Sequence, residues 1–209
     1  MRFLRRSPTV VTLALILAVF VCQQVAAAVG LGGLFALSNP LLARPWTLVT
    51  SVYAHGGIPH VLGNAAALAL GGLLVERLTT RARFHAFFVA VGALAGVAEV
   101  AVVGVVGPLV PWLPPGARVL GASGAILGLY GYLLGANRLT EWVVGGVELP
   151  PRVQLAAGVV LAAVITLLTA SPNAALIAHF SGLLLGFLAG RGQLLSPTGS
   201  AEKRQPTVE

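Results

Sequence analysis

Six long apolar runs, joined by short polar stretches, constrain the fold of this chain more than any other feature of its sequence. No run alternates apolar and polar residues with the period of two that marks a half-buried strand. Inside lipid, backbone N–H and C=O groups must find partners within their own segment, which a helix provides. The sequence therefore predicts an all-α, polytopic membrane protein with six transmembrane helices, at roughly 9–30, 58–76, 84–107, 121–136, 153–171 and 173–190.

The composition indicates the same surroundings. Apolar residues make up 57% of the 209 residues and charged residues only 9%, whereas soluble domains carry about 25% charged residues. The net charge of +7 does not indicate a nucleic-acid partner, because the basic residues stand in short clusters between apolar runs. The single cysteine, Cys22, excludes an intrachain disulfide, and no Cys/His cluster has zinc spacing. We expect a lipid bilayer as the partner of this chain, and neither metal nor cofactor.

The basic residues also predict an orientation in the membrane. If the N-terminus is cytoplasmic, only Arg44 and Arg118 of the 13 Lys and Arg residues fall on the outer side. Short loops rich in Lys and Arg stay in the cytoplasm. We therefore expect a multi-pass protein of the cell membrane with both termini cytoplasmic.

The first apolar run has two interpretations. Three arginines within residues 2–6 precede it and three alanines at 26–28 end it, which resembles a secretory signal peptide. The polar pair Gln23 and Gln24 also weakens it as a membrane span. A retained helix is favoured, because apolar residues continue to about Leu37.

Four polar residues lie where the prediction places lipid: His60, Asn64, Ser123 and His179. Such side chains are costly at membrane depth, so each requires a function or a partner. At about 1.5 Å of rise per residue, Asn64 and His179 both lie roughly 9 Å below the outer surface. The short fourth run places Ser123 at a similar depth. Each residue alone could serve helix packing, but depths that coincide in the orientation set by the arginines indicate one shared site.

Two glycine stripes could bring Ser123 and His179 together. Small residues allow helix backbones to approach closely in lipid, so the fourth and sixth runs could pack tightly enough for a hydrogen bond between the two side chains. Plain helix packing would explain the glycines but not the histidine. The stripes are Gly124, Gly128, Gly131 and Gly135 beside Ser123, and Gly182, Gly186 and Gly190 after His179.

These motifs resemble those of rhomboid intramembrane serine proteases. Residues 121–124 match the GxSG motif at the head of the fourth helix, and Ala178-His179 with Gly182 and Gly186 is similar to the AHxxGxxxG pattern of the sixth. The pair His60 and Asn64 resembles the HxxxN motif of the second helix. Three motifs in this order are specific, and the similarity covers about residues 44–190.

The resemblance implies a six-helix rhomboid-like bundle that cleaves peptide bonds in or near transmembrane segments of protein substrates. Ser123 would be the nucleophile and His179 the base. His60, Asn64 and the backbone at Gly121 and Ser123 would bind the oxyanion and the substrate. Gly124, Gly182 and Gly186 would be structural. The implied regions are an N-terminal helix with a short outer loop at 1–43, a catalytic core at 44–192 and a disordered cytoplasmic tail at 193–209.

The sequence contains no Asp, which excludes a Ser-His-Asp triad. Glu76 lies too near the cytoplasmic end of its helix to orient His179. Glu99 is the only carboxylate that could approach the site, and a structural role is favoured for it, which leaves a Ser-His dyad. Leu127 stands where rhomboids commonly place an aromatic residue against the catalytic histidine. One alternative is an inactive rhomboid-like protein that binds transmembrane clients. The other is an unrelated six-helix transporter or channel, but the sequence shows little of the inverted repeats or charged pathway expected of one.

Overall fold

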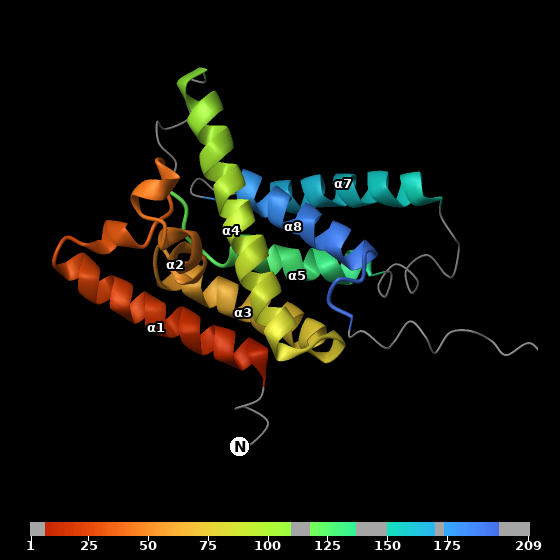
Figure 1. Cartoon of the computed structure of the whole chain (residues 1–209), viewed down its shortest axis with the longest axis horizontal. Coiled ribbons are helices and arrows are strands. Elements are labelled where there is room, and N and C mark those ends of the chain that lie inside the picture. The colour runs from red at the N-terminus through yellow and green to blue at the C-terminus, as the bar shows by residue number, and fades with distance from the viewer. Residues whose placement is uncertain (1–6, 110–117, 137–149, 170–173, 197–209) are drawn as a thin grey trace, which may run out of the picture.

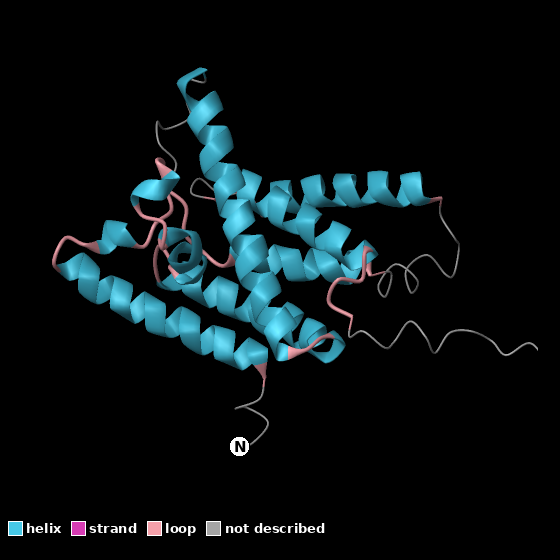
Figure 2. Ribbon diagram, viewed as in Figure 1, coloured by secondary structure: helices cyan, strands magenta, loops and turns pink. Residues whose placement is uncertain are grey.

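The computed structural model describes residues 7–109, 118–136, 150–169 and 174–196 (Figure 1). Helices make up the architecture of these residues, and none of them forms a β-strand (Figure 2). Short 3-10 turns occupy Gly32–Leu34, Leu41–Ala43, Glu76–Leu78 and Gly107–Leu109. The helices are α1 (Pro8–Ala28), α2 (Thr47–Tyr53), α3 (Ile58–Val75), α4 (Arg81–Val106), α5 (Ser123–Gly135), α7 (Pro151–Leu168) and α8 (Leu176–Arg191).

The predicted all-α class is confirmed for the part of the chain that the structure describes. Each of the six predicted runs overlaps one helix, with ends that differ by a few residues, and the short helix α2 was not predicted. Within the described residues, three segments are long and apolar enough to cross a membrane: α1, Ile58–Leu78 and Arg81–Leu109. The helices α5, α7 and α8 are apolar but shorter. Six complete membrane crossings therefore stay a prediction. The division into three regions also stays a prediction, and residues 197–209 of the predicted tail lie outside the described residues.

The central helix of the fold is α5. It packs against α8, α4 and α3, and Figure 1 shows α4 crossing in front of it, with α8 alongside and α7 beyond α8. Phe84 and Phe88 of α4 join Leu129 and Tyr132 of α5 in the main apolar core, where all four side chains are almost fully buried. Because the core surrounds α5 along its length, the first residue of this helix has a fixed position.

Helices α5 and α8 meet backbone to backbone along a glycine seam, formed by Gly124, Gly128, Gly131 and Gly135 on α5 and Gly182, Gly186 and Gly190 on α8. A Cβ atom added to Gly182 would overlap the carbonyl group of Gly124, and one added to Gly186 would overlap that of Gly128. In the other direction, a Cβ on Gly131 would overlap the Leu183 carbonyl. No side chain larger than hydrogen fits at these three positions without moving the helices apart.

The outer faces of the peripheral helices are apolar. Leu17 and Val25 of α1 are 58% and 66% exposed, and Leu167 and Leu168 of α7 are 69% and 80% exposed. Apolar side chains at this density are unfavourable in water but match the hydrocarbon of a bilayer. These faces therefore suit lipid, in agreement with the membrane class predicted from the sequence.

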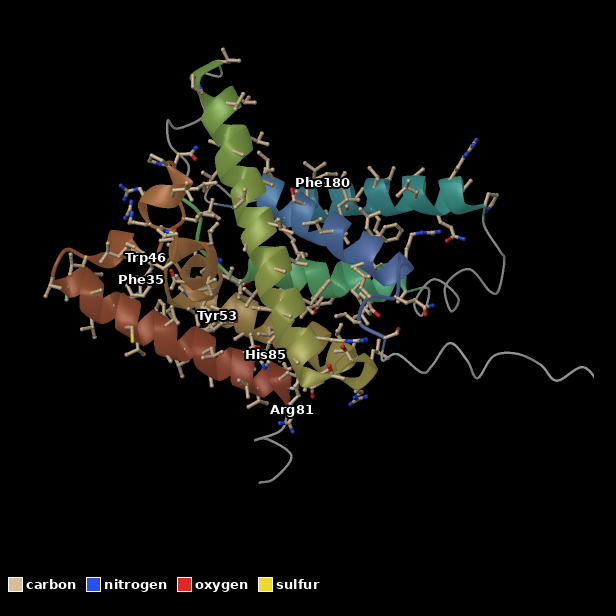
Figure 3. All side chains as sticks on the ribbon, viewed as in Figure 1. Phe35, Trp46, Tyr53, Arg81, His85 and Phe180 are labelled. Carbon is tan, nitrogen blue, oxygen red and sulfur yellow. The ribbon has the colours of Figure 1, made fainter. Side chains whose placement is uncertain are left out.

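Polar contacts fasten the start of α1 to the rest of the fold. Glu76 Oε2 accepts hydrogen bonds from the Ser7 hydroxyl at 2.6 Å and from the Thr9 backbone N–H at 3.1 Å. His85 of α4, labelled in Figure 3, lies at the same end of the molecule, with Nδ1 3.4 Å from Thr12 Oγ1. Glu76 is thus bound at the first turn of α1, away from Ser123 and His179.

Candidate active site

Ser123 is the first residue of α5, and the loop before it sets its direction. Gly121 has a φ of +132°, a conformation that side-chain-bearing residues rarely adopt. Its N–H donates to the Ser51 carbonyl at 2.9 Å, which ties the loop to α2. The first N–H groups of a helix have no partner within that helix. The turn therefore places the Ser123 hydroxyl beside backbone donors at the start of α5.

His179 reaches this serine from α8. Its Nε2 lies 2.9 Å from Ser123 Oγ, a hydrogen-bond distance. The His179 side chain is buried, with 9% of its surface exposed, and its position along α8 places it one turn before Gly182 of the seam. The steric limit at the seam fixes the separation of the two helix backbones and hence of the two side chains.

The other imidazole nitrogen of His179 contacts a hydroxyl group. Nδ1 lies 3.2 Å from Oγ1 of Thr169, the C-cap residue that follows α7. The same oxygen lies 2.9 Å from the Ile165 carbonyl and 3.1 Å from the Thr166 carbonyl. Among the described residues, no carboxylate forms a hydrogen bond with the imidazole ring.

Glu99 of α4 approaches the site but binds the backbone. Its Oε2 accepts a hydrogen bond from the Ala178 N–H at 2.9 Å, in the first turn of α8. A carboxylate at a helix N-terminus satisfies a free N–H group and interacts favourably with the helix dipole. Glu99 is itself buried, with 9% of its surface exposed. This carboxylate therefore fixes the end of α8 that carries His179, rather than the imidazole itself.

His60 lies close to Gly121 beside Ser123. A Cβ atom built on Gly121 would lie 2.8 Å from His60 Cε1 and 3.8 Å from Ser123 Oγ. Asn64 follows His60 by four residues on α3 and so lies on the same face of that helix. Its side chain is buried, and its Nδ2 donor has no hydrogen-bond partner among the described residues. An unpaired buried amide is costly, and its N–H can still donate to an acceptor that enters the site.

A second histidine supports the loop before Ser123. His55 is fully buried, and its Nδ1 donates to the Tyr53 carbonyl at 3.0 Å. Its Nε2 thus faces the Ala122 N–H as an acceptor, at the long distance of 3.5 Å. Burial lowers the pKa of His55 to about 4, so the ring is neutral near pH 7. Gln23 of α1 accepts the His55 backbone N–H at 2.9 Å, which connects the first helix to this loop.

Comparison with known proteins identifies the family. Residues 42–195, most of the chain, match the rhomboid domain family model. The chain therefore belongs to the rhomboid family, whose members are generally serine proteases that act inside membranes. The resemblance predicted from the three motifs is confirmed.

Relatives occur in a plant and a bacterium. The chain is 32% identical over 152 residues to RHOMBOID-like protein 5 of Arabidopsis thaliana, covering 73% of the chain and 45% of the relative. It is 30% identical over 143 residues to the rhomboid-family protein YdcA of Bacillus subtilis (strain 168), covering 68% and 64%. RHOMBOID-like protein 6, mitochondrial, of A. thaliana is 28% identical over 158 residues, covering 76% and 47%. The chain thus spans about half the length of the plant relatives.

Some residues at this site have no motif in the sequence. Thr169 and Gln23 were not among the predicted site residues, and Gln23 counted only as a weakness of the first span. Each is a common residue type whose partner lies on another helix, so spacing gives no signal. A polar residue inside or at the end of an apolar run is the one general indication available for both.

Proposed function

We propose that this chain is an intramembrane serine endopeptidase that hydrolyses peptide bonds in or near transmembrane segments of other membrane proteins. The observation that carries the proposal is the 2.9 Å contact between Ser123 Oγ and His179 Nε2. Ser123 attacks the scissile carbonyl carbon while its proton passes to Nε2. The imidazolium then returns that proton to the leaving amine. Water hydrolyses the acyl-enzyme by the same exchange and releases the second product.

The negative charge of the tetrahedral intermediate requires donors close to Ser123. The proposed donors are the Ser123 backbone N–H at the start of α5, the Asn64 amide and His60, whose ring approaches Ser123 closely because Gly121 has no side chain. The unpaired Asn64 Nδ2 and the close approach of His60 to Gly121 beside Ser123 support this assignment. Loss of one such donor typically raises the barrier by about 2.7–4 kcal/mol.

The proposed setting is a six-helix bundle with cytoplasmic termini, in which the site opens toward the outer side. The bias of the basic residues supports the orientation, and the apolar outer faces of α1 and α7 support contact with lipid. Substrates are single-span or multi-span membrane proteins that enter laterally, near α7. The name of the relative YdcA includes the words rhomboid protease. This supports peptidase activity and specifies no substrate.

A fluorophosphonate probe tests the nucleophile directly. Purified protein in detergent should be labelled at Ser123, the Ser123→Ala variant should not be labelled, and the His179→Ala variant should be labelled at least about 100-fold more slowly. Equal labelling of the Ser123→Ala protein would refute the assignment of the nucleophile.

Cleavage of a substrate separates a protease from a client-binding protein. A single-span model substrate incubated with the wild-type chain in liposomes should be cut within or beside its span, and Ser123→Ala should leave it intact. Retained binding of the substrate without any cleavage by the wild-type chain would instead favour an inactive rhomboid-like protein.

A further inference from the structure

His179 Nε2 accepts a proton from Ser123 only if that nitrogen carries a lone pair. A neutral imidazole has one protonated and one unprotonated nitrogen, and the partner of the second nitrogen decides which is which. In a Ser-His-Asp triad, a carboxylate accepts the Nδ1 proton. The sequence here contains no Asp, and Glu99 bonds the α8 backbone instead. Some other acceptor must face Nδ1, and the group found there is Thr169 Oγ1 at 3.2 Å.

The hydrogen bonds around Thr169 indicate the direction of that contact. A threonine hydroxyl has one proton to donate and two lone pairs with which to accept. Two carbonyl groups, those of Ile165 and Thr166, lie 2.9 Å and 3.1 Å from Oγ1, and a carbonyl can only accept. The single Thr169 proton is therefore directed to one of these carbonyls, in the back-bond to the preceding turn that threonine commonly forms. The hydroxyl oxygen then faces His179 Nδ1 as an acceptor.

We infer that Thr169 is a positioning residue that holds His179 in the Nδ1–H tautomer, with the Nε2 lone pair directed at Ser123. This inference rests on the proposed function and adds a third residue, which positions the histidine of the Ser-His dyad. In the proposed attack, the Ser123 proton moves to Nε2, and the resulting imidazolium keeps its Nδ1–H bond to the Thr169 oxygen. The hydroxyl takes the place of the carboxylate in a triad without carrying charge into lipid, where a carboxylate is costly.

The position of Thr169 suits this function. The residue caps the C-terminus of α7, and its backbone N–H already donates to the Ile165 carbonyl at 3.0 Å, so the back-bonded hydroxyl has little freedom. Leu127 cannot hold the imidazole by a hydrogen bond, because its side chain has no polar atom. The orientation of His179 is therefore set from α7, a helix different from the one that carries the nucleophile.

Three variants isolate the hydroxyl. Thr169→Val keeps the shape but removes the acceptor, and Thr169→Ser keeps the acceptor. Thr166→Val is the matched control, because the Thr166 hydroxyl on the same helix is buried without a partner among the described residues. We expect Thr169→Val to lower kcat roughly three- to tenfold with KM unchanged, as loss of one hydrogen bond predicts. Thr169→Ser and Thr166→Val should stay within about twofold of the wild type.

A spectroscopic measurement reports the tautomer independently of turnover. In protein labelled with ¹⁵N-histidine, the two ring nitrogens of a neutral imidazole give separate signals for their protonated and unprotonated states. The His179 signals, assigned by their loss in His179→Ala, should show a protonated Nδ1 in the wild type and in Thr169→Ser. Thr169→Val should shift the population toward the Nε2–H tautomer, and Thr166→Val should not.

Different results would refute the proposed function and the inference about Thr169. A wild-type chain that neither labels with fluorophosphonate nor cleaves a substrate refutes the proposed function, while the tautomer of His179 remains measurable. A protonated Nε2 in the wild-type chain, or a Thr169→Val variant with unchanged kcat and unchanged tautomer, overturns the inference about Thr169. Equal losses in Thr169→Val and Thr166→Val also overturn it, because they would indicate a general effect on α7.

Discussion

Helix α8 is supported differently by its neighbours on two sides. Toward α5, backbone lies against backbone, and three glycines of the seam leave no room even for a methyl group. Toward α7 and α4, single polar side chains carry the contacts that bear on His179: the Thr169 hydroxyl on its ring and the Glu99 carboxylate on its helix. The first kind of contact is steric and sets a distance. The second kind is directional and sets an orientation.

This difference matters for a proposed dyad of neutral groups. The energy of a single hydrogen bond is modest, about 0.5–1.5 kcal/mol net, so polar contacts alone would hold the two side chains loosely. A glycine seam lets the two backbones pack closely, and this contact sets the spacing of the helices. We therefore expect changes at the seam to be severe and not compensated by conservative substitution, and changes at the polar contacts to be milder and restorable.

The largest effect should follow from a methyl group added at the seam. In Gly182→Ala the new Cβ meets the Gly124 carbonyl, so α5 and α8 must separate. We expect stability to fall by about 1–3 kcal/mol. Activity should fall by about 100-fold, because a displacement near 1 Å between reacting groups has an effect of that size. Thermal unfolding in detergent and cleavage of a single-span substrate measure the two quantities.

Gly63→Ala is the matched control for the seam. Gly63 lies on α3, and a Cβ built there has no heavy atom within 4 Å. The same substitution should be neutral or should stabilise by about 0.4–1 kcal/mol, because alanine restricts the unfolded chain. If Gly182→Ala were as active and as stable as Gly63→Ala, the seam would not set the distance between Ser123 and His179.

A smaller effect on activity should follow from removing the carboxylate at the start of α8. Glu99→Leu leaves the Ala178 N–H without its acceptor, and we expect a loss of about 1.5–3 kcal/mol in stability with about tenfold lower activity. Glu99→Gln keeps an oxygen that can accept the same bond, so most of the activity should remain. Comparison of unfolding midpoints and cleavage rates of the two variants tests this. Near-complete inactivation of a folded Glu99→Gln protein would mean that the charge itself takes part in the chemistry.

The sequence predicted the rigid features of this molecule better than the directional ones. The helices follow from six apolar runs, and the glycine stripes follow from a spacing of three or four residues that a helix turns into a face. Ser123 and His179 stood out because polar residues in apolar runs are rare. Each of these signals lies within one segment of the sequence, so it can be recognised without knowing how the helices pack together.

The directional contacts depend on where helices cross. Glu99 was identified as the one carboxylate able to approach the site, but its partner, the Ala178 N–H, follows only from the packing of α4 against the start of α8. The bond of Thr169 to His179 likewise requires that α7 end beside α8. Gln23 lowered the apolar character of the first run, and only the fold shows that this buried amide accepts the His55 N–H.

The smallest effect should come from this contact between α1 and the loop before Ser123. Gln23→Leu removes the acceptor of the His55 backbone N–H, and His55 in turn faces the Ala122 N–H. We expect about 1 kcal/mol lower stability, typical of one hydrogen bond, and a threefold reduction in activity at most. Gln24→Leu is the matched control, because Gln24 is the same residue type one position further along α1 but is exposed, whereas Gln23 is buried.

The pair also bears on the two interpretations of the first apolar run. A larger loss in Gln23→Leu than in Gln24→Leu, measured by thermal unfolding and by substrate cleavage, would show that α1 supports the loop before Ser123 in the working protein. A removed signal peptide could not contribute in this way, because its side chains would be absent from the folded chain. If the two variants behave alike, α1 does not support the site. The polar contacts that orient it would then come from α2, α4 and α7 alone.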